Sequence, residues 1–306
     1  MKRPLSLLVG LAVVGLFVAG CQETTIAEEE SSGSPVVYAV NYPLFYIAER
    51  LGGELISLKA SVPAGVDPAR SMPRDETLVS MQSADLILRN GATFAKWWEQ
   101  VSMPRSIAWD TTADHADSLI VIKDAVVHTH GDGKTHSHAG YATTTWLDFD
   151  LAARQAASVK EALIKLIPDS AEVITGNAEE LIVDLRALDA EMIEIGFSLG
   201  EKPLFASHPG YEYFAKRYGT RVENFHWDGD VRIDAKAEAA LIEKLGEVKA
   251  EAMLWQSPPL AENIALLEKH GIRSVVFQPA TNRPEDGRDF LDVMSANIGG
   301  LKALLD

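Results

Sequence analysis

The chain has 306 residues and a formal net charge of −16 at pH 7, and 47% of its residues are hydrophobic. This length can bury one large core or two of ordinary size, and the composition is that of a globular protein. The acidic balance argues against nucleic acid as a partner and is compatible with the attraction of cations.

The first 21 residues resemble a bacterial lipoprotein signal. Lys2 and Arg3 precede an apolar run, and a Val-Ala-Gly triplet leads to Cys21, the one cysteine of the chain. We expect cleavage before Cys21 and a lipid on its sulfur. The alternative is a plain membrane-spanning anchor, but the segment from Pro4 to Gly20 is short for that and contains a proline and glycines. A lipidated Cys21 leaves no free thiol, which excludes disulfides and cysteine-ligated metal.

Residues 22–34 (QETTIAEEESSGS) are polar and acidic and show no apolar periodicity. We therefore expect a disordered tether with an average reach of roughly 20 Å. Such a tether places the folded part close to a bacterial membrane on its extracytoplasmic side, either in the periplasm or at the cell surface.

From Pro35 onward, β-rich runs alternate with helical patterns such as Pro43–Leu51 and Asp75–Ser83. The alternation predicts two α/β lobes with mainly parallel sheets, at residues 35–147 and 203–306, with a helical segment at 148–202 between them. The expected strands are Val36–Val40, Leu55–Val62, Asp85–Leu88 and Leu119–Ile122 in the first lobe, and Leu204–Ala206, Arg221–Phe225, Ala252–Trp255 and Ser274–Phe277 in the second.

The segment from Asp169 to Leu199 has one unbroken apolar stripe at helical spacing. Asp169 and Glu172 have the spacing of a capping box, and Gly200 supplies a stop. A coiled-coil strand is the alternative, but the pairing of charges at its flanks is irregular. We expect a rigid backbone helix that joins the two lobes of a monomer. The stripe consists of Ala171, Ile174, Ala178, Leu181, Leu185, Leu188, Met192, Ile195 and Leu199.

Polar residues follow the predicted strands of the second lobe. They are His208 after the first strand, His226 after the second, Gln256 after the third and Gln278 after the fourth. Ligands of open α/β sheets bind beyond the carboxyl ends of the strands, so these side chains are candidates for a binding cleft. A single histidine there is more often an ordinary surface or core residue than a ligand, but two on neighbouring strand ends raise the case for a site.

The sharpest motif is HTHGDGKTHSH, at residues 128–138. His128 and His130 are two apart, as are His136 and His138, and the GDGKT between them can turn the chain back. If the two arms pair as strands, all four imidazoles share a face. Imidazole suits zinc, copper and nickel ions. The alternative is a solvated loop that binds metal loosely.

Several segments together resemble the zinc- and manganese-binding lipoproteins that deliver metal to ABC importers. The likeness covers nearly all of residues 35–306. It is carried by VNYPLFYIAERLGGE at 40–54, VPAGVDP at 62–68, SADLILRNGATFAKWWE at 83–99, TTTWLDFDLA at 143–152, ASHPGYEYFAKRYG at 206–219 and VVFQPATNRP at 275–284. The resemblance implies two α/β lobes on a long helix, a bound metal ion, an ABC importer permease as partner and no enzymatic activity.

The chain departs from the metal site that this family usually has, which takes three histidines and one acidic residue. Ala69 and Thr144 stand where the first two histidines are expected, and Gln278 stands where the acidic residue is expected. Only His208 matches. A neutral amide is a poor replacement for a carboxylate on zinc.

Two interpretations remain. In the first, the site has moved, as in a divergent branch with a histidine loop before TTWLD and a His-Trp pair in the second lobe. The loop, which contains His128, His130, His136 and His138, would then supply imidazoles in place of Ala69 and Thr144, and His208 with His226 would complete a tetrahedral Zn²⁺ site. Nitrogen ligation favours Zn²⁺ over Mn²⁺, and Cu²⁺ and Ni²⁺ are lesser alternatives. In the second, the scaffold has lost tight binding and acts as a weak metal buffer or an adhesin-like partner-binding lipoprotein.

A hydrolytic enzyme is the hypothesis from another class, with Asp148 or Glu212 as the base. Against it, Asp148 begins the helix after WLD, where an acidic residue is also a cap, and Glu212 lies on an ordinary amphipathic helix. A purely structural role is a further alternative.

Overall fold

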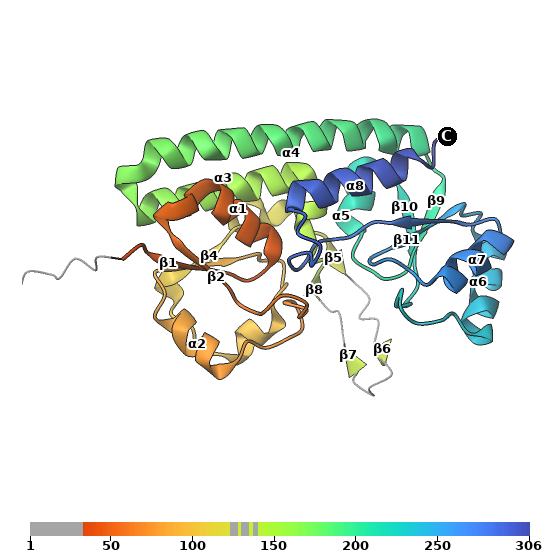
Figure 1. Cartoon of the computed structure of the whole chain (residues 1–306), viewed down its shortest axis with the longest axis horizontal. Helices are drawn as coiled ribbons and strands as arrows, with labels where there is room; N and C mark the ends of the chain where they lie inside the picture. The colour runs from red at the N-terminus through yellow and green to blue at the C-terminus, as the bar shows by residue number, and fades with distance from the viewer. Residues whose placement is uncertain (1–32, 123–127, 130–134, 137–139) are drawn as a thin grey trace, which may run out of the picture. The chain divides into compact units, whose positions relative to one another are not determined.

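The computed structural model describes residues 33–122 and 140–306, together with the backbone of 128–129 and 135–136 (Figure 1). Residues Ser34–Asp306 form one compact unit. The predicted signal peptide and residues 22–32 of the predicted tether lie outside the described residues. No helix in the described part of the chain is long and apolar enough to cross a membrane.

The first sheet has four parallel strands in the order β2-β1-β3-β4. They are β1 (Val36–Ala39), β2 (Ser57–Ala60), β3 (Leu86–Arg89) and β4 (Ala108–Asp110), with the helices α1 (Tyr42–Gly52) and α2 (Asp75–Gln82) in the connections. The central strands β1 and β3 are almost wholly buried, as short apolar runs in parallel sheets should be.

The prediction that Leu119–Ile122 supplies a strand of this sheet was wrong. Only β5 (Val121–Ile122) is extended there, and it pairs antiparallel with β8 (Gly140–Tyr141) in a separate two-stranded ribbon. The fourth strand of the sheet is instead β4, whose sequence AWD is half-buried at an edge and has no apolar run.

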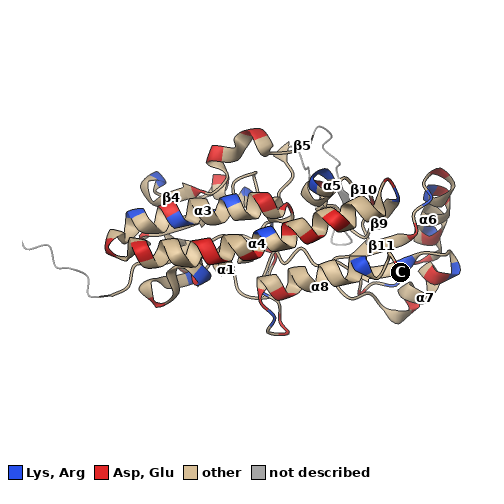
Figure 2. Cartoon of the chain, turned by 90° about the horizontal axis from the view of Figure 1, so that it is seen from above, with Lys and Arg blue, Asp and Glu red and all other residues tan. Residues whose placement is uncertain are grey.

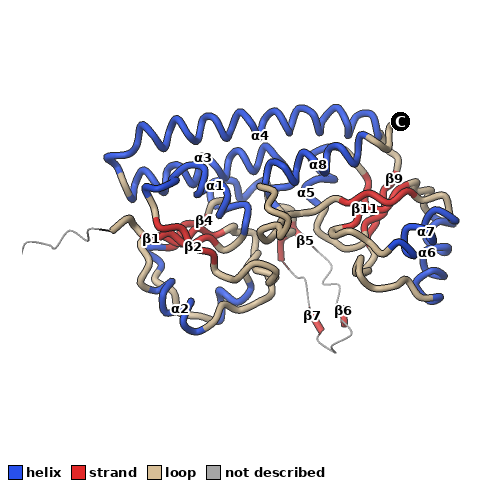
Figure 3. The backbone as a smooth tube through the Cα atoms, viewed as in Figure 1, coloured by secondary structure: helices blue, strands red, loops and turns tan. Residues whose placement is uncertain are grey.

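The second sheet contains all four strands predicted for it. These are β9 (Pro203–Ala206), β10 (Arg221–Asn224), β11 (Ala252–Trp255) and β12 (Arg273–Val276), which run parallel in the order β10-β9-β11-β12. The helices of this half are α5 (Glu212–Tyr218), α6 (Ala235–Glu247), α7 (Ala261–Lys269) and α8 (Phe290–Lys302). Figure 3 shows the two sheets as separate groups of strands, which confirms two α/β lobes.

A single helix, α4 (Ala171–Leu199), runs along both lobes and is unbroken over 29 residues. It packs against α1 and α3 (Phe149–Leu166) on one side of the molecule and against α5 and α8 on the other. Every member of the predicted stripe is buried except Ala171, which is half-buried. Figure 2 shows several acidic bands along α4 with other residues between them, and the exposed side chains of the helix also include the apolar Val183 and Phe197.

The two ends of α4 were predicted with different success. Gly200 ends the helix at φ +61°, in the left-handed region, and its N–H donates to the carbonyl of Gly196. The predicted capping box of Asp169 and Glu172 was wrong, because Pro168–Ser170 forms a 3-10 turn and the cap residue Ser170 makes no side-chain cap bond.

The segment that follows β12 reaches back to the first lobe. Trp146 Nε1 donates to the carbonyl of Pro279 at 2.6 Å. Asn282 Nδ2 donates to the carbonyls of Pro63 and Val66 at 3.0 and 2.5 Å. These bonds hold the loop after β2, where the family's first histidine is expected, against the second lobe.

Candidate metal site

His208 and His226 lie side by side at the carboxyl ends of β9 and β10. Their ring centroids are 6.0 Å apart and the rings are nearly perpendicular, at 88°. Backbone bonds beyond the strands set this spacing, since the N–H of Phe225 donates to Ala206 and that of Trp227 donates to Ser207, each at 2.8 Å. The juxtaposition expected from the strand-end rule is therefore present.

An acidic residue that the sequence reading missed lies next to this pair. His208 Nε2 is 3.4 Å from Asp228 Oδ1, and the side chain of His208 is only 16% exposed. Trp227 stacks on Phe225 with ring centroids 4.1 Å apart, which fixes the backbone that carries Asp228. The position of Asp228 two residues after His226 was the one signal that the sequence offered.

The first-lobe positions where the family usually has histidines make contacts of their own. Thr144 is 5% exposed, and its hydroxyl donates to the carbonyl of Gly210 at 2.6 Å, which joins the two lobes. Ala69 lies in a turn in which its N–H donates to Asp67 Oδ1 at 2.9 Å. The methyl group of Ala69 cannot ligate a metal ion, and the hydroxyl of Thr144 is already engaged with the carbonyl of Gly210.

Gln278 has hydrogen-bond partners of its own. Its N–H donates to Asn297 Oδ1 at 2.9 Å, and its Oε1 accepts from Arg288 Nη2 at 3.1 Å. It lines a cavity between β12 and α8 that has no histidine in its wall. A guanidinium on the amide oxygen makes this oxygen a poor partner for a second cation.

The two arms of the histidine motif pair over the residues that are described. The strands β6 (His128–Thr129) and β7 (Thr135–His136) are antiparallel, with His128 opposite His136. The predicted pairing of the arms is confirmed there, whereas His130 and His138 lie outside the described residues. Within the described residues, no group of three or more His, Cys, Asp or Glu is placed to hold a metal ion.

The two candidate bases of the enzyme hypothesis have structural roles. Asp148 caps α3, because its Oδ1 accepts the N–H groups of Asp150 and Leu151 at 3.0 and 3.1 Å. Glu212 accepts the N–H of Gly210 at 3.3 Å. Burial raises the pKa of both carboxyls, and the backbone bonds they accept oppose that rise.

The architecture defines the class of protein first. Two parallel α/β lobes on one long helix, with polar side chains beyond the strand ends, are typical of a solute-binding protein. The family model described as "ZnuA: Zinc-uptake complex component A periplasmic" matches residues 37–304, and the chain belongs to this family.

Individual relatives carry the names of different metals. The chain is 25% identical over 307 residues to the "Manganese ABC transporter substrate-binding lipoprotein scaA" of Streptococcus gordonii, with 94% of each chain covered. It is also 22% identical over 321 residues to the "Zinc-binding lipoprotein AdcA" of Streptococcus pneumoniae. This match covers all of the present chain and 62% of AdcA. Among solved structures, the metal-dependent lipoprotein YcdH of Bacillus subtilis matches with a TM-score of 0.73 at 19% identity, covering 89% of this chain and 97% of that one.

Proposed function

We propose that this protein is a lipid-anchored, extracytoplasmic carrier that binds a metal ion and delivers it to an ABC importer permease. Zn²⁺ is the preferred ion. The observation that supports this proposal most directly is the pair of histidines at neighbouring strand ends, with Asp228 beside His208. Membership of the zinc-uptake family and the names of the relatives agree with a metal cargo and with a permease partner. Cys21 would carry the lipid, and the carrier would act as a monomer.

The proposed ligands are His208 and His226 together with imidazoles from the motif at 128–138. His136 and His138 are the first choice from the motif because they are nearer in the sequence to TTTWLD, whose helix start should mark the wall of the cleft. His128 and His130 are the second choice. Gln278 is the weakest member of the set, because its amide oxygen already accepts from Arg288.

Zinc is preferred to manganese because the candidate ligands are mainly nitrogen donors, while Mn²⁺ favours oxygen. Asp228 supplies one oxygen within reach of His208, and a site with three nitrogens and one carboxylate still suits tetrahedral zinc. Cu²⁺ and Ni²⁺ also accept imidazole ligands and are the lesser alternatives to Zn²⁺.

The competing function is a weak metal buffer or a lipoprotein that binds another partner. One observation favours it: the described residues alone contain no group of three potential ligands close enough to hold an ion. The buffer predicts several loose sites, whereas the carrier predicts one tight site.

The test is equilibrium titration of the metal-free protein with Zn²⁺ at pH 5 and pH 7.5. Each histidine must lose its proton before it coordinates, so the affinity should fall by more than about tenfold at the lower pH. His208→Ala and His226→Ala should weaken the tight site. His270→Ala is the matched control, since His270 lies in the same lobe but pairs with Glu238 at 3.0 Å. An affinity that is the same at both pH values would show that histidines are not the ligands.

A further inference from the structure

A second cavity lies in the first lobe, at the carboxyl ends of β3 and β4. Its volume is about 620 Å³, which is ample for a small organic molecule. Arg89, Trp98, Asp110 and Tyr141 are among the residues that line it. Neither His208 nor His226, which lie in the other lobe, lines this cavity.

Arg89 brings a partly buried positive charge to this cavity. Its guanidinium carbon lies 4.4 Å from the ring centroid of Trp98, a cation–π geometry. Asp110 is its neighbour in the strand register, yet the guanidinium makes no ion pair or hydrogen bond with any residue that the structure describes. Burial lowers the pKa of Arg89 despite the opposing pull of Asp110 and Glu99. A desolvated cation of this kind is stabilised by an anion that completes its hydrogen bonds.

The loop after β3 has an unusual backbone. Gly91, Ala92 and Thr93 have φ values of +69°, +48° and +54°, so three consecutive residues are in the left-handed region and two of them are not glycine. For the two non-glycine residues, such a conformation costs on the order of 1–3 kcal/mol each, and strain of this kind concentrates at ligand sites. The N–H groups of these three residues make no hydrogen bond within the described part of the chain, and successive N–H groups in turns form concave anion sites.

The same cavity has an acidic side. Asp110 Oδ1 accepts both the N–H and the hydroxyl of Thr112 at 3.0 Å, which holds the carboxylate in place. Glu99 also lines the cavity, and with Arg89 and Lys96 the four ionisable side chains sum to zero formal charge. A ligand that carries both charges suits this wall better than a simple anion.

We propose that this cavity binds a small zwitterion of the α-amino acid class. Its carboxylate lies against Arg89 and the N–H groups of residues 91–93, and its ammonium group lies toward Asp110 and Glu99. The ring of Trp98 fixes the guanidinium that receives the carboxylate. Arg89 recognises the ligand's carboxylate, and the carboxylates of Asp110 and Glu99 recognise its ammonium group, by charge-assisted hydrogen bonds. The volume of the cavity leaves room for the ligand's side chain.

The position of the cavity gives the ligand a contact with the segment that precedes α3. The N–H of Tyr141, in β8, donates to the hydroxyl of Thr93 at 3.4 Å, and Tyr141 lines the cavity. A bound amino acid therefore touches both the left-handed loop and the ribbon strand β8.

The experiment is calorimetric titration of the full chain, kept free of metal by a chelator, with the common L-α-amino acids offered singly. At least one should bind with a dissociation constant in the millimolar range or tighter. Arg89→Gln should weaken that binding by about tenfold or more, since a charge-assisted contact is lost. Asp110→Asn should also weaken it, because the amide oxygen can still accept from Thr112 but the charge is gone. Arg105→Gln is the control, as Arg105 is exposed in the same lobe and does not line the cavity.

Three results would overturn the proposal. The first is that no amino acid binds the wild-type chain. The second is that Arg89→Gln binds the amino acid as tightly as wild type does. The third is that acetate and inorganic phosphate bind as tightly as the amino acid. Because metal is absent throughout, each result is independent of whether the second lobe carries the metal site.

Discussion

The pKa of Glu212, a residue near the candidate metal site, is shifted by burial. It lies in the first turn of α5, four residues after His208, and accepts the N–H of Gly210. Burial raises the pKa of its carboxyl above the ordinary value of 4.5. The ionised form is therefore disfavoured in the folded protein relative to the unfolded chain.

The sign of the pH effect follows from this shift. Below the unfolded pKa, Glu212 is protonated in both states and carries no penalty; as the pH rises through the folded pKa, stability is lost. Glu212→Gln removes the charge, so its stability relative to wild type should rise between pH 4 and pH 7. Urea unfolding at both pH values measures this. Glu179→Gln is the control, because Glu179 is exposed on α4. A Glu212→Gln variant whose stability relative to wild type does not rise between pH 4 and pH 7 would refute the assignment.

The sequence allowed some site residues to be found but not others. His208 and His226 were predictable because each follows a buried apolar strand, and the ends of neighbouring parallel strands meet. Asp228 was missed because an acidic residue in a DGD turn has no periodicity that marks it. Arg89 was missed because its importance comes from tertiary contacts: a stacked Trp98 from a 3-10 turn, and an adjacent strand that carries Asp110.

At the scale of elements, α4 is the clearest success of the sequence. A 29-residue stripe at helical spacing has no competing β interpretation, and tertiary packing buries it almost throughout. The β4 strand was missed for the opposite reason: three residues at the edge of a sheet carry too little pattern to predict. The start of α4 could not be predicted from the spacing of Asp169 and Glu172, since a 3-10 turn replaced the expected capping box.

The stripe on α4 makes a direct stability prediction. Leu185 is 1% exposed near the middle of the helix, so Leu185→Asp buries an unpaired charge and should cost about 4 kcal/mol or more. Val183 lies on the same helix but is 65% exposed, and Val183→Asp should change stability by less than about 1 kcal/mol. Chemical denaturation of both variants measures the difference. Equal losses would mean that Leu185 does not hold the core.

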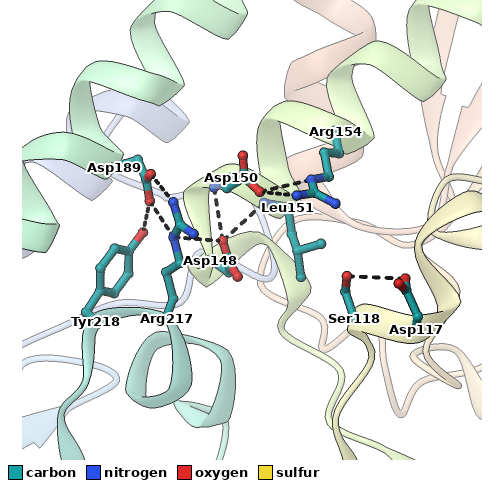
Figure 4. Close-up of polar contacts among 9 residues, drawn as sticks. All are labelled: Asp117, Ser118, Asp148, Asp150, Leu151, Arg154, Asp189, Arg217 and Tyr218. Atoms are coloured by element: carbon teal, nitrogen blue, oxygen red, sulfur yellow. Dashed lines mark hydrogen bonds and ion pairs between the residues drawn. The ribbon is translucent and has the colours of Figure 1, made fainter.

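At the scale of the whole molecule, an ionic network ties α4 to the second lobe and to the start of α3 (Figure 4). Arg217 on α5 binds both carboxylate oxygens of Asp189, at 3.1 and 2.5 Å, and lies 3.7 Å from Asp148. Tyr218 donates its hydroxyl to Asp189 and accepts the N–H of Phe149. The hydrogen bonds with Asp189 raise the pKa of Arg217, so its guanidinium stays ionised.

Breaking this network should loosen the second lobe from the helix. Asp189→Asn removes the nearer of the two carboxylates that Arg217 pairs with and should cost about 3 kcal/mol, because Asp189 is buried. Asp184→Asn is the matched control on α4: Asp184 pairs with Arg50 at 3.2 Å, but its side chain is 46% exposed, so about 0–1 kcal/mol is expected. Thermal unfolding compares the two, and similar small losses would show that the network is not a structural link.

The most direct test of the proposed metal carrier is whether the second-lobe histidines and the motif histidines bind the same ion. Zinc titrations are needed for wild type, His208→Ala, the double change His136→Ala/His138→Ala, and all three changes combined. A single shared site predicts one tight zinc per chain, weakened by either set of changes. The combined loss in binding free energy should then be smaller than the sum of the two separate losses. Two or more weak sites whose losses add would contradict delivery by a single shared site and favour a metal buffer.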